Sequence, residues 1–162
     1  MVSTKKAPRR ELSFHCTGCL KEELARIESA HHRGTLAHTG NWTPGENLDH
    51  IALNWEFAFD GPPPEARVPF ILRLVGPFVK RRFTSGKTLP SGFKIPKSAS
   101  YMEPRPGCSF EDGRARLQRI LDRLDRGERM TQRSPAFGAM SHDEWMGLNL
   151  AHAQLHLGFL SY

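Results

Sequence analysis

Two histidines, His152 and His156, lie four residues apart in the apolar run NLAHAQLHLGF near the end of the chain. Four residues is just over one helical turn, so both imidazoles project from the same side of a helix. Such a pair can ligate one metal ion, but on an apolar helix face it is more often structural. The run reads His-Ala-Gln-Leu-His, so it lacks the glutamate that zinc proteases use as a base. The spacing alone leaves both interpretations open.

His50 is the candidate for a third metal ligand. It lies at the edge of an apolar stripe formed by Ile51, Trp55 and Ala58, so we expect its ring to point partly inward. Inward-facing side chains from two helices can build a metal site inside a helical bundle. Three neutral imidazoles would leave one coordination position open for water or substrate.

Two asparagines lie one helical turn from these histidines and could support such a site. Asn54 follows His50 by one turn and Asn149 precedes His152 by one turn. We expect each amide to hydrogen-bond an imidazole or a metal-bound water. The remaining histidines are interpreted as ordinary surface or helix-end residues: His15, His31, His32, His38 and His142.

The elements that must position these residues are helices, because several segments carry their own start signals. Thr43, Pro44 and Glu46 form a capping box with proline at the first helical position, and Ser141 with Glu144 forms another capping box. We predict helices over residues 17–32, 43–61, within 68–83 with a kink or break at Gly76–Pro77, 109–126, and from 141 to the C-terminus.

The predicted fold class is all-α, a bundle of four or five helices with a long irregular connector. Residues 84–107 are rich in proline and glycine, and we expect this connector to cover or border the metal pocket. No segment shows the alternation of a strand, and no internal repeat is visible. Residues 1–13 are predicted to be a flexible basic segment, and residues 14–162 the folded domain.

The overall composition fits one soluble globular domain. The 162 residues are 38% hydrophobic and 25% charged, with a formal net charge of +6. The charge favours a small anionic substrate, while the lack of interleaved aromatic residues argues against nucleic acid. Without an apolar segment after the basic N-terminal residues, and without a long apolar run, we expect a cytoplasmic protein that is not in the membrane. The sequence is compatible with a homodimer as well as with a monomer.

Two further features of the sequence indicate no function. Cys16 and Cys19 form a Cys-x-x-Cys at a helix start, but without a second cysteine pair or a βαβ context we interpret them as half-buried small hydrophobic residues. A basic stretch is interpreted as a solvated helix end and loop in preference to an anion-binding rim: residues 80–82, Lys87, Lys94 and Lys97.

The order of the motifs resembles the DinB-like superfamily of metal-binding helical bundles, and in particular a branch known as a domain of unknown function. The resemblance covers nearly the whole chain from about residue 11. The residues that carry it are Gly40, Asn41 and Trp42; His50; Pro135, Phe137 and Gly138; Ser141, Glu144 and Trp145; and His152 with His156. Three positions depart from the pattern, namely Leu155, Ser134 and the apolar residues 158–160.

The resemblance implies a four-helix bundle in which His50, His152 and His156 hold a divalent metal, zinc or nickel in most relatives. It also implies a metal-dependent enzyme acting on a small molecule, either a transferase that uses a low-molecular-weight thiol or a hydrolase-like enzyme. The alternative is a non-catalytic stress-response or nucleic-acid-associated protein in which the histidine cluster is structural. Catalytic residues, substrate and reaction are left unassigned.

Overall fold

The structure is a computed structural model that describes residues 3–64, 66, 70–92, 95 and 97–162. The described part of the chain is mostly helical, which agrees with the predicted all-α class. It contains α1 (Thr17–His32), β1 (Ala37–His38), α2 (Pro44–Asp60), α3 (Phe70–Phe83), the 3-10 helix η1 (Lys97–Met102), α4 (Phe110–Asp125), α5 (His142–Leu157) and β2 (Leu160–Ser161). None of the described helices combines the length and the apolar character needed to cross a membrane.

The two predicted capping boxes are confirmed, and a third helix also begins at a capping serine. The Thr43 hydroxyl accepts the N–H of Glu46 and the Glu46 carboxylate accepts the N–H of Thr43, which completes the capping box of α2. Ser141 caps α5 in the same reciprocal way, and Ser109 caps α4. Because these bonds satisfy N–H groups that have no partner within the helix, the sequence itself defines where α2, α4 and α5 begin.

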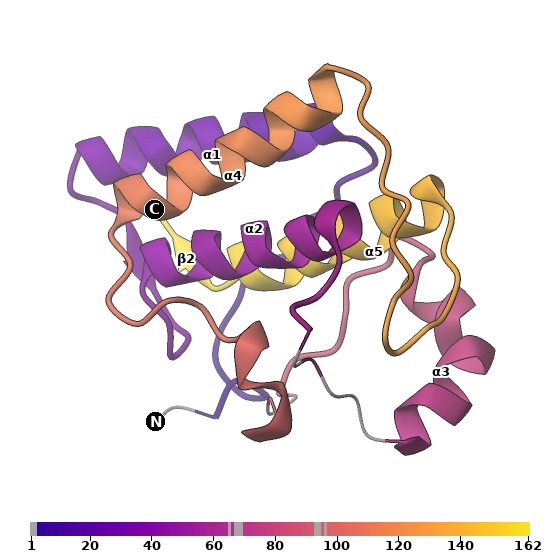
Figure 1. Ribbon diagram of the computed structural model, residues 1–162. Helices are drawn as coiled ribbons and strands as arrows, with labels where there is room; N and C mark the ends of the chain where they lie inside the picture. Colours follow the sequence, from indigo (N-terminus) through magenta and orange to yellow (C-terminus); the bar gives the residue numbers. More distant parts are fainter. Residues whose placement is uncertain (1–2, 65, 67–69, 93–94, 96) are drawn as a thin grey trace.

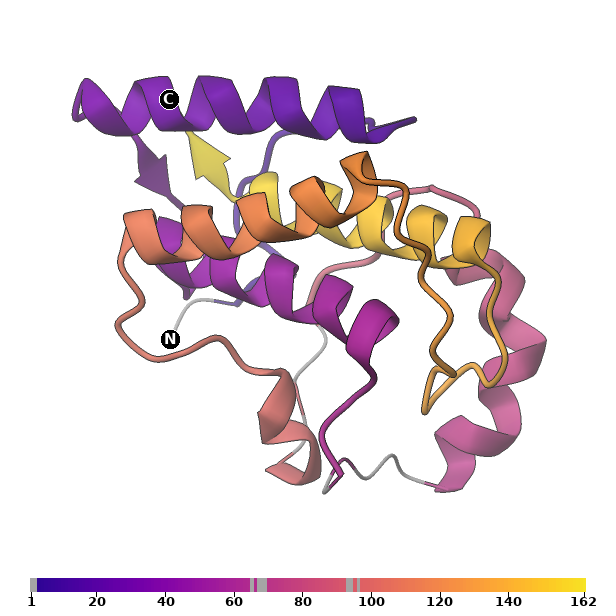
Figure 2. The same ribbon diagram turned by 45° about the horizontal axis from the view of Figure 1, so that its top comes forward.

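Four of the helices lie in two layers, with α1 beside α4 and α2 beside α5 (Figure 1). α4 runs parallel to α2 and antiparallel to α1, as ion pairs show: Arg123 with Asp60 at the helix ends, and Lys21 with Asp125 across the α1–α4 face. α3 lies to one side of these four helices in both views (Figure 2). α2 is central, since it packs against both α4 and α5.

The core lies between the two layers and is formed by one apolar face of each helix, including the predicted stripe of α2. In α1 and α2 these faces include Leu24, Ile27, Ile51 and Trp55, each fully buried. α4 contributes Leu117, Ile120 and Leu121, and α5 contributes Leu150, Ala153 and Leu157. The helices position the histidines because burial of these faces fixes how α2 and α5 face each other.

Two boundaries near the C-terminus differ from the prediction. α5 ends at Leu157 and does not run to the C-terminus, and the chain turns at Gly158 into β2. β2 pairs antiparallel with β1, so that Ala37 lies opposite Ser161. Strands of two residues are too short to show any alternation, which is why the sequence gives no strand signal.

α3 continues through Pro77, so the break that was one of the two predicted outcomes at Gly76–Pro77 is not observed, while the kink stays a prediction. Several of its described apolar side chains are exposed, among them Phe70 and Phe78. Gly76 has a packing role instead, since a Cβ there would lie 1.9 Å from the carbonyl oxygen of Ala136. Proline is tolerated on this exposed helix because water can satisfy the carbonyl that loses its N–H partner.

A buried ion pair connects α1 to both ends of the chain. Glu23 is only 2% exposed, and its carboxylate accepts a hydrogen bond from Arg10 at 2.6 Å and one from the Tyr162 hydroxyl at 3.1 Å. The Arg10 guanidinium also donates to the carbonyl of Leu160 at 2.6 Å, and its backbone N–H donates to that of Gly158. These contacts fasten residues around Arg10 to the end of α5. The predicted boundary between residues 13 and 14 stays a prediction.

Arg10→Met is expected to lower the free energy of unfolding by about 1.5–3 kcal/mol, because it leaves the buried Glu23 carboxylate without its main cationic partner. Urea denaturation measures this change. The matched control is Arg9→Met, since the exposed Arg9 donates to the Leu89 carbonyl at 3.4 Å and should contribute little. Equal losses in the two variants would contradict the role of the Arg10–Glu23 pair.

Candidate metal centre

The structure brings together the three histidines that the sequence singles out. His50 comes from α2, and His152 and His156 come from consecutive turns of α5. One ring nitrogen from each lies within 4.8 Å of the others, and this is the only such group of three or more metal-ligating side chains in the part of the chain that the structure describes. The Nε2 atoms of His50 and His152 are 3.1 Å apart.

This spacing fits a shared metal ion. Two imidazole nitrogens bound at about 2.0–2.1 Å in tetrahedral geometry are separated by about 3.3–3.4 Å, and the His50–His152 distance is close to that value. The Nδ1 atom of His152, on the other side of the ring from Nε2, is buried without a hydrogen-bond partner among the described residues, so this ring lacks an outer acceptor. By their spacing, the three side chains could hold a divalent metal.

The backbone carbonyl of Met102 fixes the tautomer of His50. The Nδ1–H of His50 donates to this oxygen at 2.7 Å, which leaves the lone pair of Nε2 facing His152. Metal-bound histidines commonly make such a bond with their second nitrogen, and it holds the ring in place. Met102 ends η1 within the 84–107 connector, so the expectation that this connector borders the site is confirmed.

All three imidazoles are held in the neutral form that can bind a metal. Burial lowers the pKa of His50 from 6.5 to about 4, against the opposing effects of the Met102 carbonyl and of Asp49. Burial also lowers the pKa of His152 and of His156 well below the ordinary value, and the neighbouring histidines lower both further. At neutral pH no proton competes for these nitrogens.

Trp42 packs directly against the cluster. Its ring stacks on His156 with centroids 5.4 Å apart and an angle of 19° between the planes, and it lies 4.6 Å from the ring of His50. His50 is buried, whereas His152 and His156 remain partly exposed. The Gly-Asn-Trp motif before α2 thus supplies an aromatic wall that limits the orientations of two of the three rings.

Asp49 connects the connector to α2 beside the site. Its side chain is fully buried and accepts from the backbone N–H of Arg105 at 2.9 Å, and it also pairs with the guanidinium groups of Arg105 and Arg116. Burial raises the pKa of Asp49, but the hydrogen bonds from Arg105 and Arg116 outweigh it and lower the pKa overall. Asp49 thus anchors the connector at Arg105, three residues after the Met102 carbonyl that accepts from His50.

The two asparagines donate their hydrogen bonds to other groups. Nδ2 of Asn54 donates to the backbone carbonyl of His50 at 3.2 Å, within α2. Nδ2 of Asn149, which is buried, lies 3.8 Å from the sulfur of Met130. Their support of a metal ligand or water stays a prediction. Met102 was not singled out from the sequence, because a backbone carbonyl carries no signal in the residue type.

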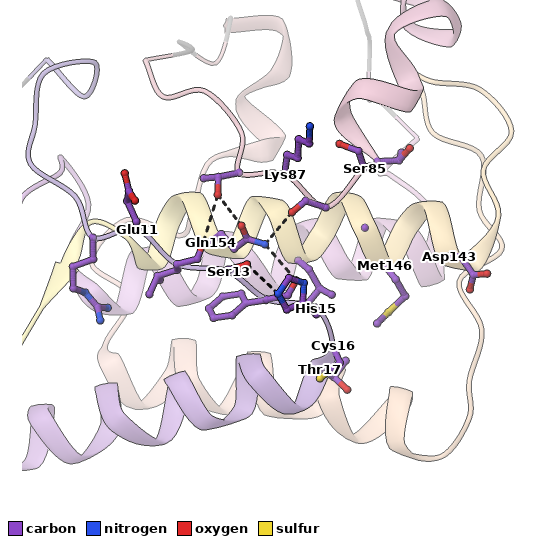
Figure 3. Close-up of a pocket in the computed structure, with 18 of the residues that line it drawn as sticks. Glu11, Ser13, His15, Cys16, Thr17, Ser85, Lys87, Asp143, Met146 and Gln154 are labelled. Atoms are coloured by element: carbon purple, nitrogen blue, oxygen red, sulfur yellow. Dashed lines mark hydrogen bonds between the residues drawn. The ribbon is translucent and has the colours of Figure 1, made fainter.

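A wide cavity of the described residues is separate from the cluster. It has a volume of about 1220 Å³, and the three histidines are not among its lining residues. It lies between the segment before α1, the segment after α3 and α5, where Gln154 hydrogen-bonds Thr88 (Figure 3). Of the basic stretch, Lys80 pairs with Glu144, and Lys87 lines this cavity; Lys94 and the side chain of Lys97 lie outside the described residues.

Fold and site together define a mostly helical protein with a three-histidine cluster able to hold a metal ion. The chain belongs to the family described as "Protein of unknown function (DUF1569)", whose model matches residues 6–162. No curated protein and no solved structure matches the chain. The family assignment agrees with the predicted uncharacterised branch, while the wider DinB-like link is not shown by it.

Asp49→Asn is expected to weaken metal binding about tenfold, because orientation of a ligand by its outer partner typically accounts for 10–100-fold in affinity. The same variant should speed hydrogen exchange at the Arg105 amide, whose acceptor it weakens. The control is Glu56→Gln. It weakens the ion pair between Glu56 and Arg116 but leaves the bonds between Asp49 and Arg105 in place. Unchanged metal affinity in Asp49→Asn would rule out the positioning role.

Proposed function

We propose that this protein binds one divalent metal ion, zinc or nickel, through His50, His152 and His156. The observation that carries the proposal is the convergence of three neutral imidazoles from two helices, with the Nε2 atoms of His50 and His152 3.1 Å apart. Borderline-soft divalent ions favour such a set of nitrogen ligands. The partial exposure of His152 and His156 supports a coordination position open to solvent.

The enzyme that we propose is metal-dependent and acts on a small molecule, as a thiol-dependent transferase or a hydrolase-like enzyme. Bound by three neutral ligands, a divalent ion keeps its full charge and lowers the pKa of a water or thiol in the open position. The +6 net charge of the chain favours an anionic substrate. Met102 and Trp42 would hold the ring of His50 in place. We also propose that the protein acts in the cytoplasm.

We also propose that the fold is a DinB-like four-helix bundle formed by α1, α2, α4 and α5. The support is the order of the motifs together with the two layers of Figure 1. In this arrangement the Gly-Asn-Trp motif, the histidine of α2 and the closing histidine pair meet at one place. The Pro-Ala-Phe-Gly turn instead packs near α3, where the rings of Phe83 and Phe137 lie 5.4 Å apart.

A structural, non-catalytic histidine cluster is the second candidate. It is favoured by the dense ring packing. The ring centroids of His152 and His156 lie 4.4 Å apart, and the ring of Trp42 packs against those of His50 and His156. In that case the cluster would hold no metal, or it would hold a metal whose coordination positions are all occupied by protein ligands. A nucleic-acid-associated role rests only on net charge and is the weakest alternative.

Metal analysis of protein purified without a histidine tag tests the first proposal. After growth with zinc and nickel, one metal ion per chain is expected, and metal-free protein under those conditions would refute it. The open position is tested with cobalt-substituted protein, whose visible spectrum should change when a small thiol or azide is added. A spectrum that stays unchanged would favour the structural cluster.

A further inference from the structure

Cys16 and Cys19 lie in contact at the start of α1. Their Sγ atoms are 3.4 Å apart, with Cys16 at the N-cap position and Cys19 one turn into the helix. Cys16 is exposed and Cys19 is partly buried, so the interpretation of both as half-buried hydrophobic residues is wrong for Cys16. The two thiols have different access to solvent, as in a pair where one sulfur reacts first.

Cys16 also lines the cavity of about 1220 Å³ that is separate from the histidines. Figure 3 shows it on the cavity wall beside His15 and Thr17, across from Met146 of α5. The volume exceeds that of most sites for drug-sized ligands. The exposed sulfur of Cys16 therefore lies at a wide, solvent-open cavity that a small molecule can enter.

The chemical surroundings of Cys16 differ from those of the third cysteine. The backbone N–H of Cys19 and then its thiol lower the pKa of Cys16, while slight desolvation opposes them. Burial and the nearby charge of Asp49 raise the pKa of Cys108. Since the thiolate is the nucleophile, Cys16 is favoured for reaction with a disulfide over Cys108. Cys108 can therefore serve as a reference cysteine within the same chain.

We propose that Cys16 and Cys19 form a dithiol site that reduces small-molecule disulfides bound in the adjacent cavity. The Cys16 thiolate attacks one sulfur of the disulfide, whose S–S bond breaks, and the first thiol leaves with a proton from solvent. The Cys19 thiolate then attacks Sγ of Cys16 in the mixed disulfide and releases the second thiol. Two electrons pass from the protein to the small disulfide, and the protein gains one S–S bond.

The geometry needs only a small movement to complete the second step. The two sulfurs must approach from 3.4 Å to about 2.05 Å, the length of a disulfide bond. Gly18 lies between the two cysteines and has no side chain that could obstruct this movement. A Cβ at Gly18 would already be in van der Waals contact with Sγ of Cys16, at 3.4 Å. Cys16 is the attacking cysteine because it is exposed to the cavity, and Cys19 is the resolving cysteine because it is shielded.

The test uses the full chain with Cys108→Ser, incubated with oxidised glutathione and trapped with an alkylating agent. Mass spectrometry should find one product that is lighter by two hydrogens and carries no alkyl group on Cys16 or Cys19. In Cys19→Ser the reaction should stop at a mixed disulfide of glutathione with Cys16. Circular dichroism checks that each variant is folded.

Rates give an independent readout in the chain with all three cysteines. At neutral pH, Cys16 should react with a small aromatic disulfide at least about tenfold faster than Cys108, because a larger fraction of it is thiolate. Cys16→Ser should remove this fast phase. Equal rates for Cys16 and Cys108, or a stable mixed disulfide on Cys16 while Cys19 is present, would overturn the proposal.

Discussion

His156→Ala is expected to lose most of the bound metal while the helices persist. The variant removes one of three nitrogen ligands and leaves two, so the affinity should fall by more than the roughly 10–100-fold that accompanies loss of an outer partner. The helices persist because the core depends on residues such as Ile27 and Leu121, which are fully buried and lie on helices that carry none of the three histidines. His50→Ala and His152→Ala should behave alike, since each ring supplies one ligand.

The measurement is metal content per chain after dialysis, with circular dichroism as the check on folding. His32→Ala is the matched control, because His32 is exposed at the end of α1 and lies outside the cluster. Its metal content should equal that of the unmodified protein. The metal site is refuted if all three cluster variants retain the same metal content as the control.

The site could be predicted from the sequence to the extent that side chains at fixed helical spacing define it. His152 and His156 lie on one helix face by geometry alone, and the capping residues Thr43 and Ser141 fix the start of the helices that carry all three ligands. The prediction that the histidine of α2 meets the histidine pair of α5 rested on the apolar stripe of α2 and on the family resemblance together. These features are local, and local patterns survive in the finished fold.

The remaining parts of the site depend on contacts between distant segments. The Met102 carbonyl reaches His50 across 52 residues, and no residue type announces a backbone acceptor. Asp49 directly precedes His50 in the sequence, and this neighbour is the one signal of the residue type that points to its role, since its burial depends on the fold. The contact of Cys16 with Cys19 depends on the conformation at the start of α1, which a Cys-x-x-Cys pattern alone does not determine.

The fold departs from the prediction where tertiary contacts override a local rule. Pro77 does not break α3, because the exposed backbone of this helix can be solvated and because Gly76 packs against Ala136. Similarly, the last residues leave the helix because Leu160 pairs with His38, a partner more than a hundred residues away. Neither partner is visible in a local window of sequence.

The metal-free protein is expected to lose stability as the pH falls below the ordinary histidine pKa. Burial lowers the pKa of His50 from 6.5 to about 4, so between these values the unfolded chain binds a proton that the folded chain does not. Stability is therefore fully present above about pH 6.5 and declines as the pH falls toward the folded value. The shift of His50 alone corresponds to about 3 kcal/mol, and His152 and His156 act in the same direction.

Urea denaturation of chelator-treated protein between about pH 7 and about pH 5 isolates this effect, because most carboxylates remain ionised there. His50→Gln removes the titrating ring but keeps an amide that can donate to the Met102 carbonyl, so its stability should depend less on pH. Added zinc should raise the stability at neutral pH and lose this effect as protons compete for the ligands. Identical pH slopes for His50→Gln and the unmodified protein would contradict the buried neutral state of His50.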